Sequence, residues 1–157
     1  MAPITLTPIG RVHSSRTEVK DDFWGQVTSV IELDAAHFTS DSLLGLTDFS
    51  HILVVYHLHS VPDKSIVTTA SYPRENPDWP RVGIFAQRGK NRPNRIGSTI
   101  VRIVGHEGRV LRVAELDAID NTPVIDIKPV MQEFLPREPV RQPQWSRELM
   151  QRYWSEG

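Results

Sequence analysis

Apolar and polar residues alternate along several short stretches of the chain, which is the pattern of β-strands buried on one face. The alternation is clearest in residues 27–33, where Val27, Ser29, Ile31 and Leu33 fall on the same face. Val, Ile and Tyr, which favour strands, are frequent in these stretches. The pattern predicts seven short strands, at residues 4–12, 27–33, 51–59, 65–70, 81–85, 98–104 and 109–116.

Helical periodicity is confined to the end of the chain. Trp145, Leu149 and Tyr153 recur at intervals of four residues, and Pro143 suits the first turn of a helix. A short turn is also expected to begin at Asp41. Because the intervals between strands are too short for repeated βαβ units, the pattern predicts a mainly β domain. A closed or partly closed β-barrel, which has no exposed strand edges, is favoured over a β-sandwich.

Two segments do not follow the strand pattern. Residues 61–80 contain four prolines and are expected to form a long exposed connection, of the kind that often carries function. Residues 131–144 are expected to form an extended strap that leads to the terminal helix. We therefore expect a barrel domain at residues 1–130, with a strap and an amphipathic helix at residues 131–157 in the same structural unit.

Composition and charge narrow the class of protein. The chain has 157 residues, of which 39% are apolar and 24% charged, and this predicts one ordinary globular domain. No apolar run reaches the length of about 20 residues that a membrane span needs, and the first residues do not resemble a signal peptide. Cysteine is absent, which excludes disulfides, thiolate metal sites and a cysteine nucleophile. A cytoplasmic location is expected.

A net charge of −1 gives the whole chain no basic field, but one loop is strongly basic. Its guanidinium groups can bind a carboxylate or a phosphate through two parallel hydrogen bonds. The alternative is a β-turn without a binding role, in which Asn94 and Pro93 only set the geometry of the turn. The basic residues of this loop, with no acid between them, are Arg81, Arg88, Lys90, Arg92 and Arg95.

Three carboxylates follow in residues 115–129, at Asp117, Asp120 and Asp126. They can accept hydrogen bonds from ribose hydroxyls, offset the basic loop or assist proton transfer. A metal site is not expected, because the spacing matches no calcium-binding loop. The structural alternative is a turn held by hydrogen bonds of Asp and Asn side chains.

Histidine and aromatic residues supply two further candidates. His51, His57 and His59 share one face of a predicted strand, but His51 and His57 are about 20 Å apart at ~3.3 Å per residue, too far for one metal ion. His59, at the strand end, is the better functional candidate. Phe23 and Trp24 can form a wall that stacks on adenine, or can anchor their loop in the core.

Four motifs together resemble the TsaA/YaeB family of TrmO-type tRNA methyltransferases. They are PIGRVHSS, LLGLTDFSHILVVYHLH, FAQRGKNRPNRIGS and DAIDNTPVIDIKP, in this order. The resemblance implies a single-sheeted, TsaA-like β-barrel, a homodimer, and binding of S-adenosylmethionine without a Rossmann domain. It also implies methyl transfer to N6 of N6-threonylcarbamoyladenosine, beside the anticodon of tRNA.

The resemblance also assigns site residues, position by position. The general base is suggested by the chemistry instead: a carboxylate such as Asp120 can accept the N6 proton. Substrate or RNA contacts are expected in the basic loop, at Lys90, Arg92, Asn94 and Arg95. The implied cofactor-binding residues are Trp24, Gly25, Gln26, His59, Ser60, Arg88, Ser98, Ile119, Asp120, Asn121 and Thr122.

The basic loop departs from the family pattern. A typical member reads ATRSPFRPNPIG where this chain reads AQRGKNRPNRIG, so Ser-Pro is replaced by Gly89-Lys90 and the second Pro by Arg95. Because this loop is expected near the substrate, two alternatives stay open. One is a methyltransferase of the same fold that acts on another RNA or on a small molecule. The other is a non-catalytic module that binds S-adenosylmethionine.

Overall fold

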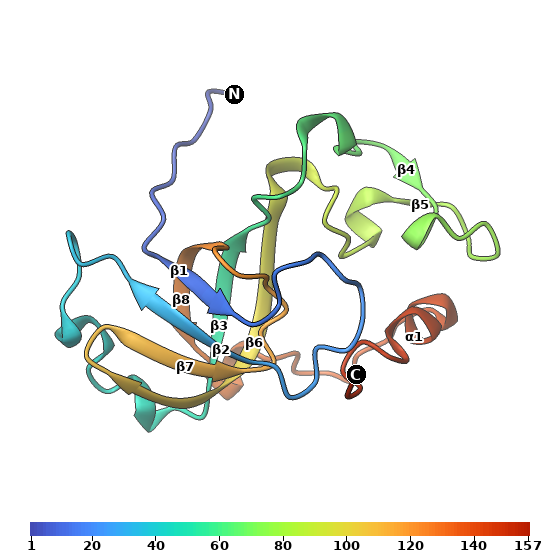
Figure 1. Cartoon of the computed structure of the whole chain (residues 1–157). Coiled ribbons are helices and arrows are strands. Elements are labelled where there is room, and N and C mark those ends of the chain that lie inside the picture. Colours follow the sequence, from blue (N-terminus) through green and yellow to red (C-terminus); the bar gives the residue numbers. More distant parts are fainter.

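A computed structural model describes residues 1–157 and contains a closed antiparallel β-barrel (Figure 1). Six strands follow one another around the barrel in the order β1-β2-β7-β6-β3-β8. The predicted mainly β fold, a single-sheeted barrel with a C-terminal strap and helix, is confirmed. The barrel strands are β1 (Gly10–Ser14), β2 (Thr28–Leu33), β3 (His51–His57), β6 (Ile96–Glu107), β7 (Val110–Ala114) and β8 (Pro123–Pro129).

The barrel interior is filled by the apolar residues that alternate along the strands. In β2, Ser29, Ile31 and Leu33 are buried, as the alternation predicts. Burying one Val, Leu or Ile side chain stabilises the fold by about 1.5–3 kcal/mol, so these inward positions hold the barrel together. The fully buried apolar residues include Val12, Ile31, Ile52, Val54, Val101, Leu111, Val113, Leu116 and Val124.

Two strand predictions at the barrel are wrong. The first strand begins at Gly10 rather than at residue 4, because Pro3 and Pro8 lack the N–H group that a sheet requires. Strand β8 was not predicted, since a proline at each end and the polar residues Asp126 and Lys128 conceal its pattern. It pairs with both β1 and β3 and so closes the barrel.

The turn between β6 and β7 lies nearer the C-terminus than the predicted strands at residues 98–104 and 109–116 indicate. Strand β6 continues to Glu107, and the chain turns at Gly108 and Arg109. Gly108 has a φ of 57°, a left-handed conformation that glycine adopts without steric cost. The short turn expected at Asp41 is confirmed as the 3-10 helix Ser40–Leu43, and a second one follows at Leu46–Asp48.

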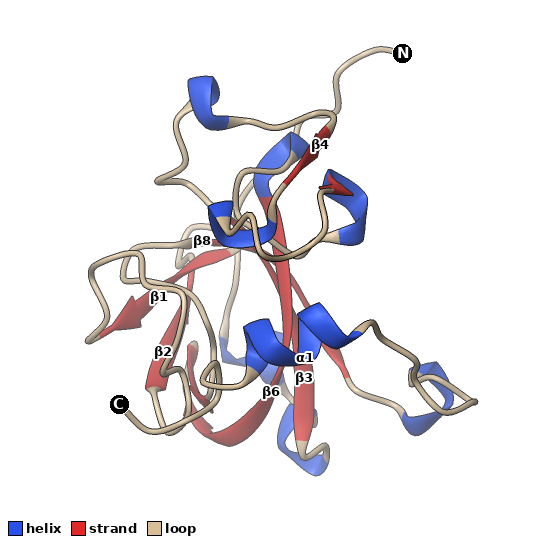
Figure 2. Cartoon of the chain, turned by 90° about the vertical axis from the view of Figure 1, so that its right-hand side faces the viewer, coloured by secondary structure: helices blue, strands red, loops and turns tan.

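The β3–β6 connection, residues 58–95, projects from the barrel beside its end (Figures 1 and 2). The strands predicted at residues 65–70 and 81–85 shrink to β4 (Ala70–Ser71) and β5 (Val82–Gly83). These two strands pair only with each other, and a two-stranded sheet without a core remains short. The connection also contains the 3-10 helices Asp63–Ser65, Pro73–Glu75, Ile84–Ala86 and Pro93–Arg95.

The C-terminal region follows the barrel as an exposed strap. Every residue from Met131 to Gln144 is exposed, with one 3-10 turn at Gln132–Phe134. Helix α1 (Gln144–Met150) is shorter than its periodicity predicts, and turns continue to Trp154. Trp79 of the β3–β6 connection donates a hydrogen bond to Glu148 of α1 (2.9 Å). None of the helices combines the length and the apolar character that crossing a membrane requires.

Candidate cofactor-binding site

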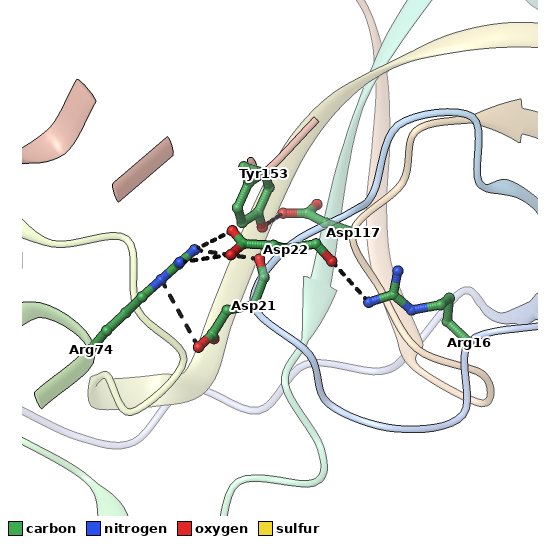
Figure 3. Close-up of polar contacts among 6 residues, drawn as sticks. All are labelled: Arg16, Asp21, Asp22, Arg74, Asp117 and Tyr153. Atoms are coloured by element: carbon green, nitrogen blue, oxygen red, sulfur yellow. Dashed lines mark hydrogen bonds and ion pairs between the residues drawn. The ribbon is translucent and has the colours of Figure 1, made fainter. Parts of the chain in front are cut away.

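Three segments meet beside the barrel: the first loop (residues 15–27, between β1 and β2), the β3–β6 connection and the end of the chain. Figure 3 shows the guanidinium of Arg74, from the β3–β6 connection, facing two acids of the first loop. It donates to both carboxylate oxygens of Asp22, at 2.8 and 3.1 Å, and lies 3.9 Å from Asp21. Such a bidentate pair fixes direction as well as distance, so it positions the first loop against the connection.

Arg16 organises the first loop from within. Its guanidinium donates to the carbonyl oxygens of Phe23 (2.7 Å) and Asp22 (3.2 Å), and it lies 4.0 Å from the ring centre of Trp24. Trp24 is only 3% exposed, so its ring serves as a core anchor covered by a cation–π contact. Phe23 and Gln26 have φ values of 67° and 64°, left-handed conformations that are costly for residues other than glycine and that collect at functional sites.

The C-terminal segment, residues 152–157, lies directly on the first loop. The backbone N–H groups of Phe23 and Trp24 donate to the carbonyls of Arg152 (3.1 Å) and Tyr153 (2.8 Å). A Cβ at Gly25 would come within 2.1 Å of the carbonyl oxygen of Trp154, so only glycine fits there. The Gln26 side chain also donates to Glu156. The predicted cofactor residues Trp24, Gly25 and Gln26 therefore all contact the end of the same chain.

A cluster of hydroxyl groups surrounds Asp117, just after β7. Tyr56 donates to one carboxylate oxygen of Asp117 (2.9 Å), Thr99 donates to the same oxygen, and Tyr153 donates to the other. Burial, and then the charge of Asp117, raise the pKa of both tyrosines far above the usual range, so both hydroxyls remain donors. Asp117 was only one of three candidate acids in the sequence.

Sequence reasoning missed the three hydroxyl partners of Asp117. Tyr56 and Thr99 both face the barrel interior, Tyr56 from β3 and Thr99 from β6, as their burial within the strand alternation shows. Two polar residues at inward positions of predicted strands are a signal that could have identified them. No such signal exists for Tyr153, which reaches the cluster from the far end of the chain.

Arg88 and Ser98 lie next to this cluster. The Arg88 guanidinium donates to the carbonyl of Ser98 (2.6 Å), the residue before Thr99. Its positive charge partly offsets the raised pKa of Tyr56 and of Tyr153. One N–H group of the five on Arg88 makes this contact. The structure thus brings together two predicted cofactor residues and the Asp117 cluster.

His59 and Ser60 follow the end of β3 and are both exposed. His59 lies close enough to His57 for its charge to act there: burial, Arg95 and His59 together lower the pKa of His57. The predicted cofactor residues His59 and Ser60 are therefore exposed and lie beside the basic loop.

The predicted turn at residues 119–122 is tied to the start of the first loop. Asp120 accepts hydrogen bonds from the backbone of Ser14 (3.0 Å) and from the side chain of Asn121 (2.8 Å). The hydroxyl of buried Thr122 donates to the carbonyl of Ile119 (2.7 Å). These contacts close the turn, and they engage both carboxylate oxygens of Asp120.

The four residues predicted to contact RNA differ in their surroundings. Arg95 donates to the carbonyl of Val61 (2.7 Å) and to Asp63 (2.8 Å), and Arg92 donates to the carbonyl of Gln87 (2.8 Å). Both arginines thus brace their own loop. Lys90 and Asn94 are exposed, and their side chains make no hydrogen bond or ion pair within the chain.

Two open cavities lie elsewhere. One of about 360 Å³ is bounded by Trp79 and Trp145, between the β3–β6 connection and α1, and one of about 340 Å³ lies along the strap at residues 136–140. Neither contains a predicted site residue. Around the Asp117 cluster and the first loop, the C-terminal segment accepts hydrogen bonds from the backbone of Phe23 and Trp24 and donates one to Asp117.

Comparisons with known proteins bear on this site. Residues 17–134 match the family model of the tRNA-methyltransferase O N-terminal domain. A probable S-adenosyl-L-methionine-binding protein of Pyrococcus abyssi is 37% identical over 141 residues, covering 88% of this chain and 74% of that protein. The tRNA (adenine(37)-N6)-methyltransferase of Escherichia coli is 35% identical over 105 residues, covering 64% of this chain and 44% of that enzyme.

The fold agrees with these relatives. The crystal structure of TrmO from Pseudomonas aeruginosa superposes with a TM-score of 0.72 at 25% identity, covering 92% of this chain and 62% of that protein. The chain therefore spans less than two thirds of the TrmO structure and less than half of the E. coli enzyme. The matched residues contain the first loop from residue 17 onward, the basic loop, the Asp117 cluster except Tyr153, and the turn at 119–122. The chain belongs to the tRNA-methyltransferase O N-terminal domain family.

Proposed function

We propose that this chain is an S-adenosylmethionine-dependent methyltransferase that methylates N6 of adenosine 37 in tRNA, with N6-threonylcarbamoyladenosine as the base acted on. The observation that carries the proposal is the family match over residues 17–134, which contains nearly all of the site. Relatives that share this region are named tRNA (adenine(37)-N6)-methyltransferases.

The side chains beside the cluster suit the chemical groups of S-adenosylmethionine. Arg88 has N–H groups left to bind the carboxylate of the methionine part, and a guanidinium binds a carboxylate well. Ser98, His59 and Ser60 lie at neighbouring strand ends and supply smaller polar groups. Trp24 is buried, so in this role it supports the first loop and does not stack on the adenine.

When bound, S-adenosylmethionine supplies a methyl group that its sulfonium already activates. The task of the chain is therefore to hold donor and acceptor in line, which alone lowers the barrier substantially. Asp120 is the proposed acceptor of the N6 proton. The side-chain amide of Asn121 donates to one oxygen of Asp120, and a substrate N–H group would share that oxygen or displace the amide. Lys90, which is exposed and unpaired, is the proposed contact to tRNA phosphates.

Methylation of defined tRNAs tests this proposal. Purified protein is incubated with isotopically labelled S-adenosylmethionine and either tRNA carrying N6-threonylcarbamoyladenosine or the same tRNA transcribed without modification. We expect label in the modified tRNA only, and nucleoside mass spectrometry should place the methyl group on N6. Labelling of both tRNAs, or of another base, would favour a different RNA substrate. Cofactor binding without methylation of any RNA would favour the non-catalytic binding module.

We further propose that the chain acts as a homodimer in the cytoplasm. The strap exposes several large apolar side chains, among them Phe134 (87% exposed) and Val140 (66%), and a second copy would cover such surface. Light scattering should give twice the 17.9 kDa of the chain at micromolar concentration. A mass equal to that of one chain would exclude the dimer.

A further inference from the structure

The C-terminal segment completes the Asp117 cluster from outside the family domain. The family match ends at residue 134, whereas Tyr153 is delivered by the last residues of the chain. Figure 3 shows its hydroxyl meeting the Asp117 carboxylate, next to the first loop. Tyr56 and Thr99, the two other partners of Asp117, belong to the barrel itself.

This segment is held to the barrel by few contacts. The strap that precedes it is exposed throughout, and α1 has no buried residue. Docking rests on the two backbone hydrogen bonds to Phe23 and Trp24, the Tyr153 and Gln26 contacts, and the bond between Trp79 and Glu148. The half-buried side chains of Trp145, Leu149, Met150 and Tyr153 add apolar contact. Segments without a fully buried side chain open at a lower free-energy cost than the barrel strands, so the docked position is reversible.

The groups that the segment satisfies are those that a nucleoside ligand would use. It takes two backbone N–H donors of the first loop and one carboxylate oxygen of Asp117. Without Tyr153, Thr99 and Tyr56 would still occupy one oxygen of Asp117, and the other oxygen would be free to accept a hydrogen bond. A ribose hydroxyl or an amino group offers the same donor as the phenol of Tyr153.

We propose that the C-terminal segment is a tethered competitor of the cofactor. In the ligand-free protein, Tyr153 occupies Asp117 and the backbone of residues 152–153 covers the first loop. A hydroxyl or amino group of the cofactor displaces Tyr153 and takes its place on Asp117. This inference rests on the proposed function, because it assumes that a cofactor binds here. Tethering makes the segment an effective competitor, since its local concentration is high.

Binding of S-adenosylhomocysteine, measured by calorimetry, tests the competition. The proteins are the full chain, a truncation that ends at Gln151, and Tyr153→Phe. The matched controls are Tyr72→Phe, whose exposed hydroxyl makes no hydrogen bond, and a deletion of residues 2–7, which are exposed. If the docked state holds about 90% of the molecules, truncation tightens binding about 10-fold, because apparent affinity scales with the competent fraction. Tyr153→Phe should tighten it about 3-fold, and the controls should match the full chain.

Asp117→Asn in the truncated chain tests whether Asp117 accepts a hydrogen bond from the cofactor. It should weaken binding by about 10-fold or more, because Asn replaces a charged acceptor by a neutral one. Equal binding by the two truncated proteins, with unchanged melting temperatures, would show that Asp117 does not contact the ligand. If truncation or Tyr153→Phe leaves binding of S-adenosylhomocysteine unchanged or weaker, the C-terminal segment does not compete with the cofactor.

Hydrogen exchange separates this inference from the proposed function. The Phe23 and Trp24 amides should be protected in the full chain without ligand, and exposed in the truncated chain until S-adenosylhomocysteine is added. Equal exchange in both ligand-free chains would show that the segment does not dock. Absence of binding by every protein, the truncated chain included, would overturn the proposed function together with this inference. Binding by the full chain that truncation does not strengthen would overturn this inference alone.

Discussion

Arg88 and Arg95 lie seven residues apart in one basic loop, yet their surroundings differ. Arg88 is exposed and makes a single hydrogen bond, to the backbone of Ser98. Arg95 is paired with Asp63 and with the backbone of Val61, and its own carbonyl accepts a hydrogen bond from Leu58. One arginine therefore has donors left for a ligand, whereas the other joins the two ends of the β3–β6 connection.

Replacing Arg88 with alanine should weaken cofactor binding with little effect on the fold. Loss of a charge-assisted contact costs about 1.5–3 kcal/mol, which raises Kd by roughly 10- to 100-fold. No cavity forms, since Arg88 is exposed, so the melting temperature should change little. Calorimetry with S-adenosylhomocysteine and thermal unfolding measure the two effects. Arg95→Ala is the comparison: it should lower the melting temperature and leave cofactor affinity intact, and the reverse pattern would refute this division of the loop.

Gly97→Ala should destabilise the barrel. A Cβ at Gly97 would lie 2.4 Å from Cε2 and 2.7 Å from Cζ of Tyr56, so the buried ring must move. Overpacking of this kind costs about 1–3 kcal/mol. Gly105→Ala is a matched control in the same strand, because nothing lies within 4 Å of its added Cβ. Urea unfolding measures both variants, and equal stabilities would show that the ring adapts without cost.

At the scale of elements, the β3–β6 connection and the first loop share one polar junction at Arg74 and Asp22. Neither segment has an extended sheet of its own in this region, because β4 and β5 contain two residues each. The junction therefore sets how these two segments sit relative to each other. Its side chains are about one quarter exposed, which limits what they contribute to overall stability.

Arg74→Ala should loosen this junction more than it destabilises the protein. A partly exposed ion pair contributes about 0–1 kcal/mol to the free energy of unfolding, so global stability should fall only slightly. Amide exchange in residues 63–83 should accelerate, because the connection loses its anchor on the first loop. Arg81→Ala, at an exposed position without a polar partner in the structure, controls for the loss of one positive charge. Unchanged exchange in Arg74→Ala would contradict the anchoring role.

At the scale of the whole molecule, the barrel provides a rigid wall and the connections bring chemistry to one side of it. Strand ends of β3 and β6 position Tyr56 and Thr99, the chain after β7 positions Asp117, and the basic loop positions Arg88.

The free energy of unfolding should fall as the pH drops from 7 to 5, partly through His57. Burial, Arg95 and His59 lower the pKa of His57 below its ordinary value of 6.5, so the unfolded chain binds a proton more readily than the folded one. The contribution of His57 is thus complete above 6.5 and is lost as the pH falls toward the folded pKa. His57→Gln should reduce the difference in urea-unfolding free energy between pH 7 and pH 5. An undiminished difference would assign the effect to other groups.

The local pattern of the sequence was sufficient for most of the barrel. Alternation in residues 27–33 identified β2 and its inward face, because each residue of a strand is assigned to a face by its neighbours alone. The run rich in Val, Ile and Tyr at residues 51–59 identified β3, which ends at His57. Four ordered motifs pointed to the family, and the first loop, the basic loop and the turn at 119–122 do lie on the matched domain. The sequence allowed two interpretations of Trp24, as a wall that stacks on adenine or as a core anchor. Its burial and its contact with Arg16 show that it is a core anchor.

Only the tertiary structure decided what depends on partners distant in the chain. Strand β8 exists because β1 and β3 supply hydrogen bonds to a segment with weak alternation. The Asp117 cluster combines residues 56, 99, 117 and 153, and no local pattern relates them. Likewise, the hydrogen bond from Arg95, a predicted RNA contact, to Asp63 joins residues that are 32 positions apart. The sequence by itself determined the faces of individual strands, whereas closure of the barrel determined which side chains meet beside it.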